Sequence, residues 1–560
     1  MIRMIKVLIA VLLIYSCAEN RKSKTTPAEE KIAALDLKKG LIISCGPPEQ
    51  QLGLVEFDAG CRADADSAFL LGMQLLHSFE YDQAERAFAE VIRKDPRCAM
   101  AYWGVAMSLY HPLWSPPTEA ELKKGSEALI IARSIEGRSE KASNYINALS
   151  AFYQNYESAD HASRMKEYSS AMKKLHETYA DDKEAAIFYA LSLSATADPS
   201  DKTFAKQKEA GKILEQLYTA NPSHPGIVHY IIHSYDYPGL APLALAAAKK
   251  YASIAPSSAH ALHMPSHIFT RLGMWDESIR ANLASIEAAR CYSEQIGLNG
   301  SWDEELHGLD YLVYAYLQKG MNDSAEVQIK YLRTINTVTP ENFKGAYTFA
   351  AAPARLVLEN KNWKQAAELN FYPAAFEWEK YPWQRSIVHL ARVLGNAHNK
   401  KFEKAKEGLD SIKVCHAQLV ALKDLYKAQQ VEIMALSGEA WLLFTSGKNK
   451  EGIEKMINAA NIEDKTEKHP VTPGEVLPAR ELLGDMYLAD GNWKEALSAY
   501  EQTLSKSPNR FNSLYGAGYA AEKSGNHQLA MKYFSQLESI SNPRSPRPEL
   551  LQQRKLIASR

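Results

Sequence analysis

LGDMYLADGNWKEALSAYEQTLSKSP (Leu483–Pro508) and AGYAAEKSGNHQLAMKYFSQL (Ala517–Leu537) decide the fold, because the two stretches repeat one another in register. Four pairs of matching positions are each separated by 34 residues: Gly484 and Gly518, Gly491 and Gly525, Ala496 and Ala530, and Tyr500 and Phe534. This period, with small residues where helices cross and an aromatic residue on the second helix, predicts pairs of antiparallel helices. Each pair buries its apolar face only against its neighbours, so the unit is expected to recur along the chain.

The pattern resembles the tetratricopeptide repeat, and it returns near the other end of the chain. LLGMQLLHSFEYDQAERAFAEVIRKDP (Leu70–Pro96) carries glycine, alanine, phenylalanine and proline at matching offsets. Further second helices are expected to begin at Trp275, Asn322, Asn362, Phe402 and Asn449. Because no convincing run of alternating apolar and polar residues appears, we expect an all-α tetratricopeptide-repeat α-solenoid, in which antiparallel helix pairs stack into a superhelix.

Composition and charge narrow the classes of function. The chain has 560 residues, too many for one ordinary core, and its hydrophobic content of 46% is normal for a globular protein. Lys and Arg total 65 against 66 Asp and Glu, so charge gives no reason to expect a nucleic-acid partner. The sequence also lacks a glycine-rich phosphate-binding loop.

The N-terminus has the pattern of an export signal. MIRMIKVLIAVLLIYSC (Met1–Cys17) has basic residues followed by a short apolar run. Its last four residues resemble a bacterial lipobox, which implies cleavage before Cys17 and acylation (palmitate) of that cysteine. An ordinary signal peptide cut nearby is the alternative. We therefore expect a lipid-anchored protein of the cell envelope, in the outer membrane or periplasm.

The chain is expected to divide into five parts. These are a signal peptide (1–16), an acylated cysteine with an N-terminal tether (17–62), an N-terminal helical region (63–223), a histidine-rich repeat region (224–345) and a C-terminal repeat region (346–560). An exported protein permits disulfides, and the five cysteines after Cys17 leave at least one thiol free. A bridge between Cys61 and Cys98 is expected, and Cys45 with Cys61 is the competing pair.

Histidines are concentrated in the middle of the chain. HPGIVHYIIHSYDYP (His224–Pro238) and HALHMPSHIFTRLGMW (His260–Trp275) hold six of the 16 histidines. Two pairs, His229 with His233 and His263 with His267, have i, i+4 spacing, and the pairs are 34 residues apart. Residues at i and i+4 share a helix face, so each pair can contribute to one metal site. Pro265 disfavours helical dihedrals at Met264, so its helix is expected to begin near Pro265, with His260 and His263 in the loop before it.

The resemblance to tetratricopeptide repeats implies where these side chains point. Positions 2, 5, 9 and 12 of the first helix of such repeats face the concave groove. His229, His233, His263 and His267 occupy positions 5 and 9, and are predicted to bind one transition-metal ion, for which Zn, Cu and Fe are the candidates. Additional ligand-binding or supporting residues are expected at Asp236, His260, His307, Asp310 and Arg355. The alternative is that the histidines hydrogen-bond a peptide or a sugar.

Residues 55–320 resemble a group of exported bacterial tetratricopeptide proteins, and the lipobox resembles those of Bacteroidota envelope lipoproteins. The resemblance implies a binding or accessory scaffold with protein or glycan-system partners, in a polysaccharide-degradation system. A metal-dependent enzyme that uses the same histidines, with Asp236 or Asp310 as its base, is the alternative.

Overall fold

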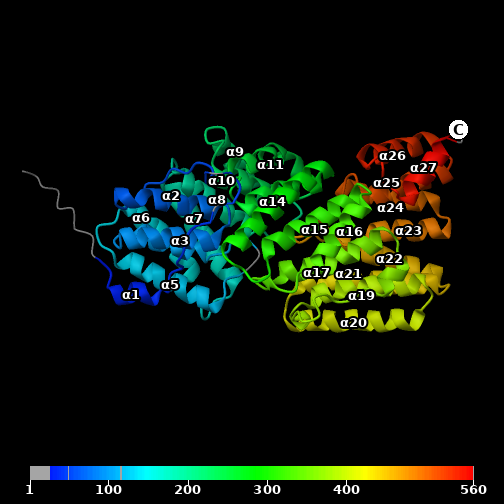
Figure 1. Cartoon of the computed structure of the whole chain (residues 1–560), viewed down its shortest axis with the longest axis horizontal. Coiled ribbons are helices and arrows are strands. Elements are labelled where there is room, and N and C mark those ends of the chain that lie inside the picture. Colours follow the sequence, from blue (N-terminus) through cyan, green and yellow to red (C-terminus); the bar gives the residue numbers. More distant parts are fainter. Residues whose placement is uncertain (1–25, 44, 48, 114–115, 559–560) are drawn as a thin grey trace, which may run out of the picture.

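The computed structural model describes residues 26–43, 45–47, 49–113 and 116–558 and shows an elongated stack of helices (Figure 1). The predicted signal peptide and Cys17 lie outside these residues. The two short strands β1 (Ser301–Trp302) and β2 (Val338–Thr339) form a parallel pair, and the rest of the regular structure described is helical. The predicted all-α fold is confirmed.

The N-terminal half forms the left part of the stack in Figure 1. Its helices are α1 (Glu29–Ala34), α2 (Ala63–His77), α3 (Tyr81–Lys94), α4 (Ala99–Ser108), α5 (Glu119–Ser134), α6 (Glu140–Tyr153), α7 (His161–Thr178), α8 (Lys183–Ala195), α9 (Ala205–Tyr218), α10 (Pro225–Tyr235), α11 (Ala241–Ile254), α12 (Ala259–His263), α13 (Pro265–Arg271) and α14 (Trp275–Gln295).

The C-terminal half continues the stack and ends at the right of the view. Its helices are α15 (Asp303–Gln318), α16 (Asn322–Leu332), α17 (Phe343–Glu359), α18 (Trp363–Ala367), the 3-10 helix η1 (Trp378–Lys380), α19 (Pro382–His398), α20 (Phe402–Ala421), α21 (Leu425–Thr445), α22 (Asn449–Asp464), α23 (Ala479–Asp490), α24 (Trp493–Lys506), α25 (Phe511–Lys523), α26 (His527–Ile540) and α27 (Pro548–Ala558).

Local sequence signals explain several helix boundaries. Thr118 and Glu121 form a reciprocal capping box that begins α5. Gly491 ends α23 with φ at +80°, and Gly525 has φ at +79° in the equivalent turn, 34 residues later. Glycine adopts this left-handed conformation without a Cβ clash, which is why both turns of the repeat carry it.

A substitution at Ala496 tests how closely the helices of the repeat pack. Its side chain on α24 is fully buried and belongs to the same hydrophobic cluster as Leu514 and Ala517 of α25. Ala496→Leu should overpack this helix crossing and lower the free energy of unfolding by about 1–3 kcal/mol. Chemical denaturation followed by circular dichroism measures the effect, and an unchanged midpoint would contradict the assignment of Ala496 to a crossing.

The segment before α2 differs from the expected tether. Leu35 and Leu52 are buried against the body, and Cys45 forms a disulfide with Cys291 on α14. Within the described part, residues 26–62 are therefore packed rather than free, because their scattered apolar side chains fill gaps along the N-terminal half. Cys61 and Cys98 form a second disulfide, which ties the start of α2 to the start of α4.

Two large hydrophobic clusters meet in the middle of the molecule. One contains residues from Leu35 to Phe269, and the other contains residues from Ile286 to Met486. The C-terminal repeats return to this junction, where the Trp275 indole donates a hydrogen bond to the Asn509 carbonyl (2.8 Å). Among the described residues, no helix is both long enough and apolar enough to cross a bilayer.

Candidate metal centre

Four helices around this junction carry the six histidines of interest. α10 carries His229 and His233, and α12, α13 and α15 carry the remaining four: His260, His263, His267 and His307. Met264 has helical dihedrals (φ −51°, ψ −38°), so α12 and α13 are almost continuous. Pro265 is tolerated because it opens α13, where its missing N–H has no helical partner to lose. The expectation of a loop here was wrong.

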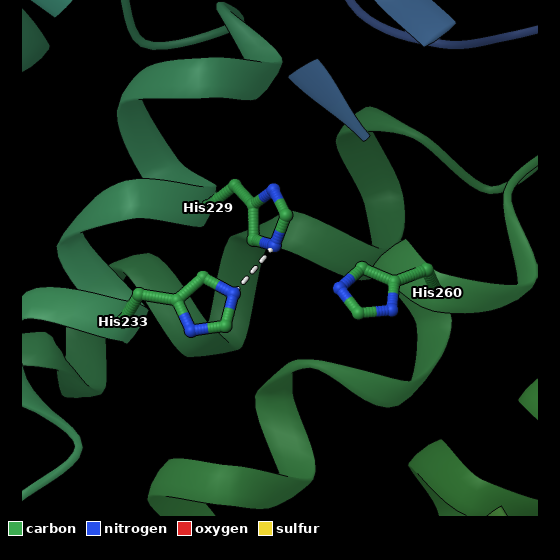
Figure 2. Close-up of side chains that lie close together, drawn as sticks. All are labelled: His229, His233 and His260. Atoms are coloured by element: carbon green, nitrogen blue, oxygen red, sulfur yellow. Dashed lines mark hydrogen bonds between the residues drawn. The ribbon is translucent and has the colours of Figure 1, made fainter. Parts of the chain in front are cut away.

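The histidines form two groups of three. In the first triad, His229, His233 and His260 each place one ring nitrogen within 4.8 Å of those of the other two, and Figure 2 shows the three rings turned toward one another. In the second triad, His263, His267 and His307 do the same. The four histidines that the spacing singled out are thus divided between two sites, and His260 and His307 complete them.

In the first triad, the Nε2 atoms of His229 and His233 lie 3.0 Å apart (Figure 2). The Nδ1 of His229 lies 2.6 Å from the backbone carbonyl of His77. A carbonyl only accepts hydrogen bonds, so Nδ1 carries the proton and the Nε2 of neutral His229 presents a lone pair to the triad.

In the second triad, the Nε2 atoms of His263 and His267 lie 3.1 Å apart. The Nδ1 of His263 is 2.7 Å from the amide oxygen of Asn282, and that of His267 is 3.0 Å from a carboxylate oxygen of Asp236. The amide nitrogen of Asn282 donates to the carbonyl of Ser278, which fixes the orientation of the amide. Both histidines therefore carry their proton on Nδ1, and the lone pairs of their Nε2 atoms face each other.

The neighbour of His267 supports this protonation state. Tyr311 donates its hydroxyl proton to the Thr472 carbonyl (3.0 Å), so its oxygen is an acceptor toward His267 Nδ1, 3.2 Å away. Burial alone would raise the pKa of Asp236, but Lys468 and Arg271 hold it well below its ordinary value, and the carboxylate is ionised. Both partners of His267 Nδ1 thus require an N–H there.

Burial keeps these imidazoles neutral. Removal from water, reinforced by the neighbouring histidines, lowers the pKa of His229, His233, His263 and His307 well below 6.5. Burial also lowers the pKa of His267, against the opposing effect of Asp236. Neutral imidazole is the form that binds metal, so the rings are ready to act as ligands at neutral pH.

These lowered pKa values predict an acid-sensitive apoprotein. Below about pH 6.5 the unfolded chain takes up protons on these histidines while the folded chain does not, so stability falls as the pH falls. The denaturation midpoint of metal-free protein should be lower at pH 5 than at pH 7.5. Equal midpoints would mean that the histidines gain protons in the folded state as easily as in the unfolded one.

The distances fit a metal ion. Zinc binds histidine nitrogen at 2.0–2.1 Å, and tetrahedral geometry then separates two ligand nitrogens by about 3.3 Å. The separations of 3.0 Å and 3.1 Å in the two triads are close to this value. Imidazole-only sites suit zinc, copper, nickel or iron, whereas the oxygen-rich sites of calcium and magnesium are not matched here.

The site is enclosed rather than exposed on a groove. Five of the six histidines are at most 5% exposed, and His233 is partly buried. Phe79, between α2 and α3, stacks on His233 with ring centroids 5.5 Å apart. Lys468, from the loop between α22 and α23 (residues 465–478, the α22–α23 loop), reaches Asp236 at 3.1 Å. The groove expected from the repeat is filled here by two loops.

The remaining predicted site residues have partners of their own. Asp236 is bound by Arg271 and Lys468 in addition to His267. Asp310 forms a buried ion pair with Arg355, which also donates to the Gly474 carbonyl at 2.9 Å. Both carboxylates are therefore paired with cationic side chains, and Arg355 is neutralised by Asp310.

A third cluster was not found from the sequence. Glu184 of α8 accepts from His77 Nε2 (2.9 Å) and from His224 Nε2 (2.7 Å). Burial would raise the pKa of Glu184, but the two histidines hold it well below its ordinary value. Because the Glu184 carboxylate already accepts a hydrogen bond from the Nε2 atom of each ring, this cluster is a buried hydrogen-bonded contact between helices. Its members come from unrelated repeats, so no spacing marks them.

The comparisons agree with this architecture. The family model described as tetratricopeptide repeat matches residues 69–111 and 482–546. The fold is a tetratricopeptide-repeat α-solenoid. Among curated proteins, no sequence matches the chain.

Several solved structures are similar to this chain at low identity. The human IFIT1 dimer with PPP-AAAA is 12% identical, over 85% of this chain and 90% of that chain, with a TM-score of 0.34. The Cut9–Hcn1 hetero-tetramer of APC/C is 13% identical, over 88% of this chain and 97% of that chain, with a TM-score of 0.26.

Proposed function

We propose that this α-solenoid is a binding scaffold that holds a transition-metal ion in its interior through the histidine triads. The observation that carries the proposal is the facing pair of His263 and His267. Both Nδ1 atoms donate hydrogen bonds, so neither Nε2 atom carries a proton. The lone pairs of these two buried Nε2 atoms therefore face each other at 3.1 Å. A cation between the two Nε2 atoms resolves this repulsion.

A bound ion would link the two halves of the molecule. The second triad joins α12 and α13, beside the N-terminal hydrophobic cluster, to α15, which belongs to the C-terminal one. The ion would thereby stabilise the curvature of the solenoid, since ligands held in place by the fold couple metal binding to folding. Repeat solenoids bind partners on extended concave surfaces, which supports an accessory role for this chain.

Metal titration tests the proposal. Protein stripped with a chelator is titrated at neutral pH with zinc, copper, nickel and, without oxygen, ferrous ion, and bound metal is measured by elemental analysis. We expect at least one ion per chain and a rise in Tm, because an ion that binds only the folded state stabilises it. If none of the four ions binds, the histidines are polar contacts for an organic ligand and the metal proposal is wrong.

The proposed location is the cell envelope, where a polysaccharide-degradation system would supply the partners. The support is the Met1–Cys17 pattern, with the two disulfides that an oxidising compartment allows. Cys17→Ala should abolish incorporation of labelled palmitate and release the protein from the membrane fraction. Wild-type protein that takes up no label, or a mature N-terminus elsewhere, would count against the lipid anchor.

A further inference from the structure

We infer that the two triads bind two ions at the same time and form an all-imidazole pair suited to copper. This inference rests on the proposed metal binding and deepens it. The sequence spacing alone suggested one ion shared by four histidines. The three-dimensional arrangement instead gives each triad its own complete set of three ligands.

The two triads have the same arrangement of ligands in consecutive repeats. Each uses the fifth and ninth positions of one repeat and the second position of the next. His229, His233 and His260 fill these positions in the first triad, and His263, His267 and His307 fill them in the second. A construction that appears twice with all of its ligands implies two sites rather than one site with spare histidines.

The supporting residues are duplicated as well. In the first triad, His260 Nδ1 lies 3.5 Å from a Glu304 carboxylate oxygen, and Glu304 is paired with Lys344. In the second, His267 Nδ1 lies 3.0 Å from Asp236, and Asp236 is paired with Lys468. A carboxylate behind a ligating histidine orients the ring and offsets part of the charge of the ion. Each triad therefore has one such carboxylate.

The repeat series stops at the next unit. There the fifth position is Asp310, which is paired with Arg355. The corresponding ninth position is Tyr314, whose hydroxyl accepts from Arg510 at 3.1 Å. In α8, the preceding helix of this kind, the fifth and ninth residues are Ile187 and Leu191, which are not metal ligands. Within the described part of the chain, the set of three histidines occurs in these two consecutive repeats.

The two sites are neighbours. The rings of His233 and His267, one from each triad, have centroids 6.3 Å apart. All six ligands are imidazoles, and the affinity of nitrogen sites for divalent ions peaks at copper. Two cupric ions at these positions would be close enough for their unpaired electrons to couple.

Copper loading with electron paramagnetic resonance tests the pair. Stripped wild-type protein titrated with cupric ion should bind two ions per chain and show a half-field signal from coupled ions. His260→Gln and His307→Gln, each removing one ligand from one triad, should bind one ion per chain and give a mononuclear spectrum. His389→Gln, a matched substitution of a buried histidine on α19, should still bind two coupled ions.

The outcomes separate this inference from the proposed function. No copper in the wild type would overturn both. One ion per chain that is lost in both the His260 and the His307 variants would leave metal binding intact and overturn the pair. Two ions without coupling would also overturn it. Circular dichroism confirms that each variant is folded, and His260→Ala and His307→Ala repeat the test where a glutamine variant is not.

Discussion

The double variant His229→Ala/His263→Ala should bind no transition metal, and added metal should no longer raise its Tm. Each substitution removes one nitrogen from the closest pair of its triad, where Nε2 atoms lie 3.0 Å and 3.1 Å apart. Two histidines that remain in a triad cannot complete a tetrahedral site. In wild-type protein, metal at 100 times its Kd should contribute about 2.7 kcal/mol, and all of this should be lost.

Two single variants serve as controls for this result. His527→Ala changes an exposed histidine on α26, and His389→Ala changes a buried one outside the triads. Both should take up metal as the wild type does, and the helical signal of the double variant should be retained. A double variant that still binds metal with unchanged affinity would place the ion elsewhere, with the cluster of His77, Glu184 and His224 as the next site to test.

Arg510→Ala should lower the free energy of unfolding by about 3–5 kcal/mol. Its guanidinium is fully buried and donates to Glu359 (2.6 Å) and twice to Glu481 (2.7 and 2.8 Å). Removing it leaves the buried carboxylates of Glu359 and Glu481 without the cation that pairs with both. Arg510 also reaches Tyr314 on α15, so the variant loosens the C-terminal repeats from the middle of the chain.

Thermal or chemical denaturation measures this effect, and Arg554→Ala is the matched control. Arg554 pairs with Glu538 at the surface, where screening by water makes ion pairs weak, so its loss should change the Tm little. If the two arginine variants prove equally stable, the buried network does not hold the C-terminal repeats in place.

The repeat period predicted the fold and part of the site. The spacing of Gly484 and Gly518 is enough to predict paired helices, and that of His229 and His263 is enough to predict histidines from adjacent repeats near one another. Both inferences follow from local periodicity, since every unit of a solenoid contacts its neighbours in the same way. The lipid anchor, the envelope location and the exclusion of nucleic acid stay predictions.

Long-range contacts account for what the period did not predict. Asp236 and Lys468 are separated by 232 residues, and Cys45 and Cys291 by 246, so no local pattern relates them. The enclosure of the site by Phe79 and the α22–α23 loop also depends on contacts between segments that are far apart in the sequence. Spacing alone could not show whether Asp310 and Arg355 bind a ligand or pair with each other. Their ion pair depends on the directions of side chains in two different repeats.

Anomalous diffraction from crystals of the copper-loaded protein tests the central claim most directly. Data collected at the copper absorption edge locate each ion without any assumption about its ligands. The account predicts one peak between the Nε2 atoms of His263 and His267 and a second beside those of His229 and His233. Copper-loaded crystals with no peak in either triad would contradict it.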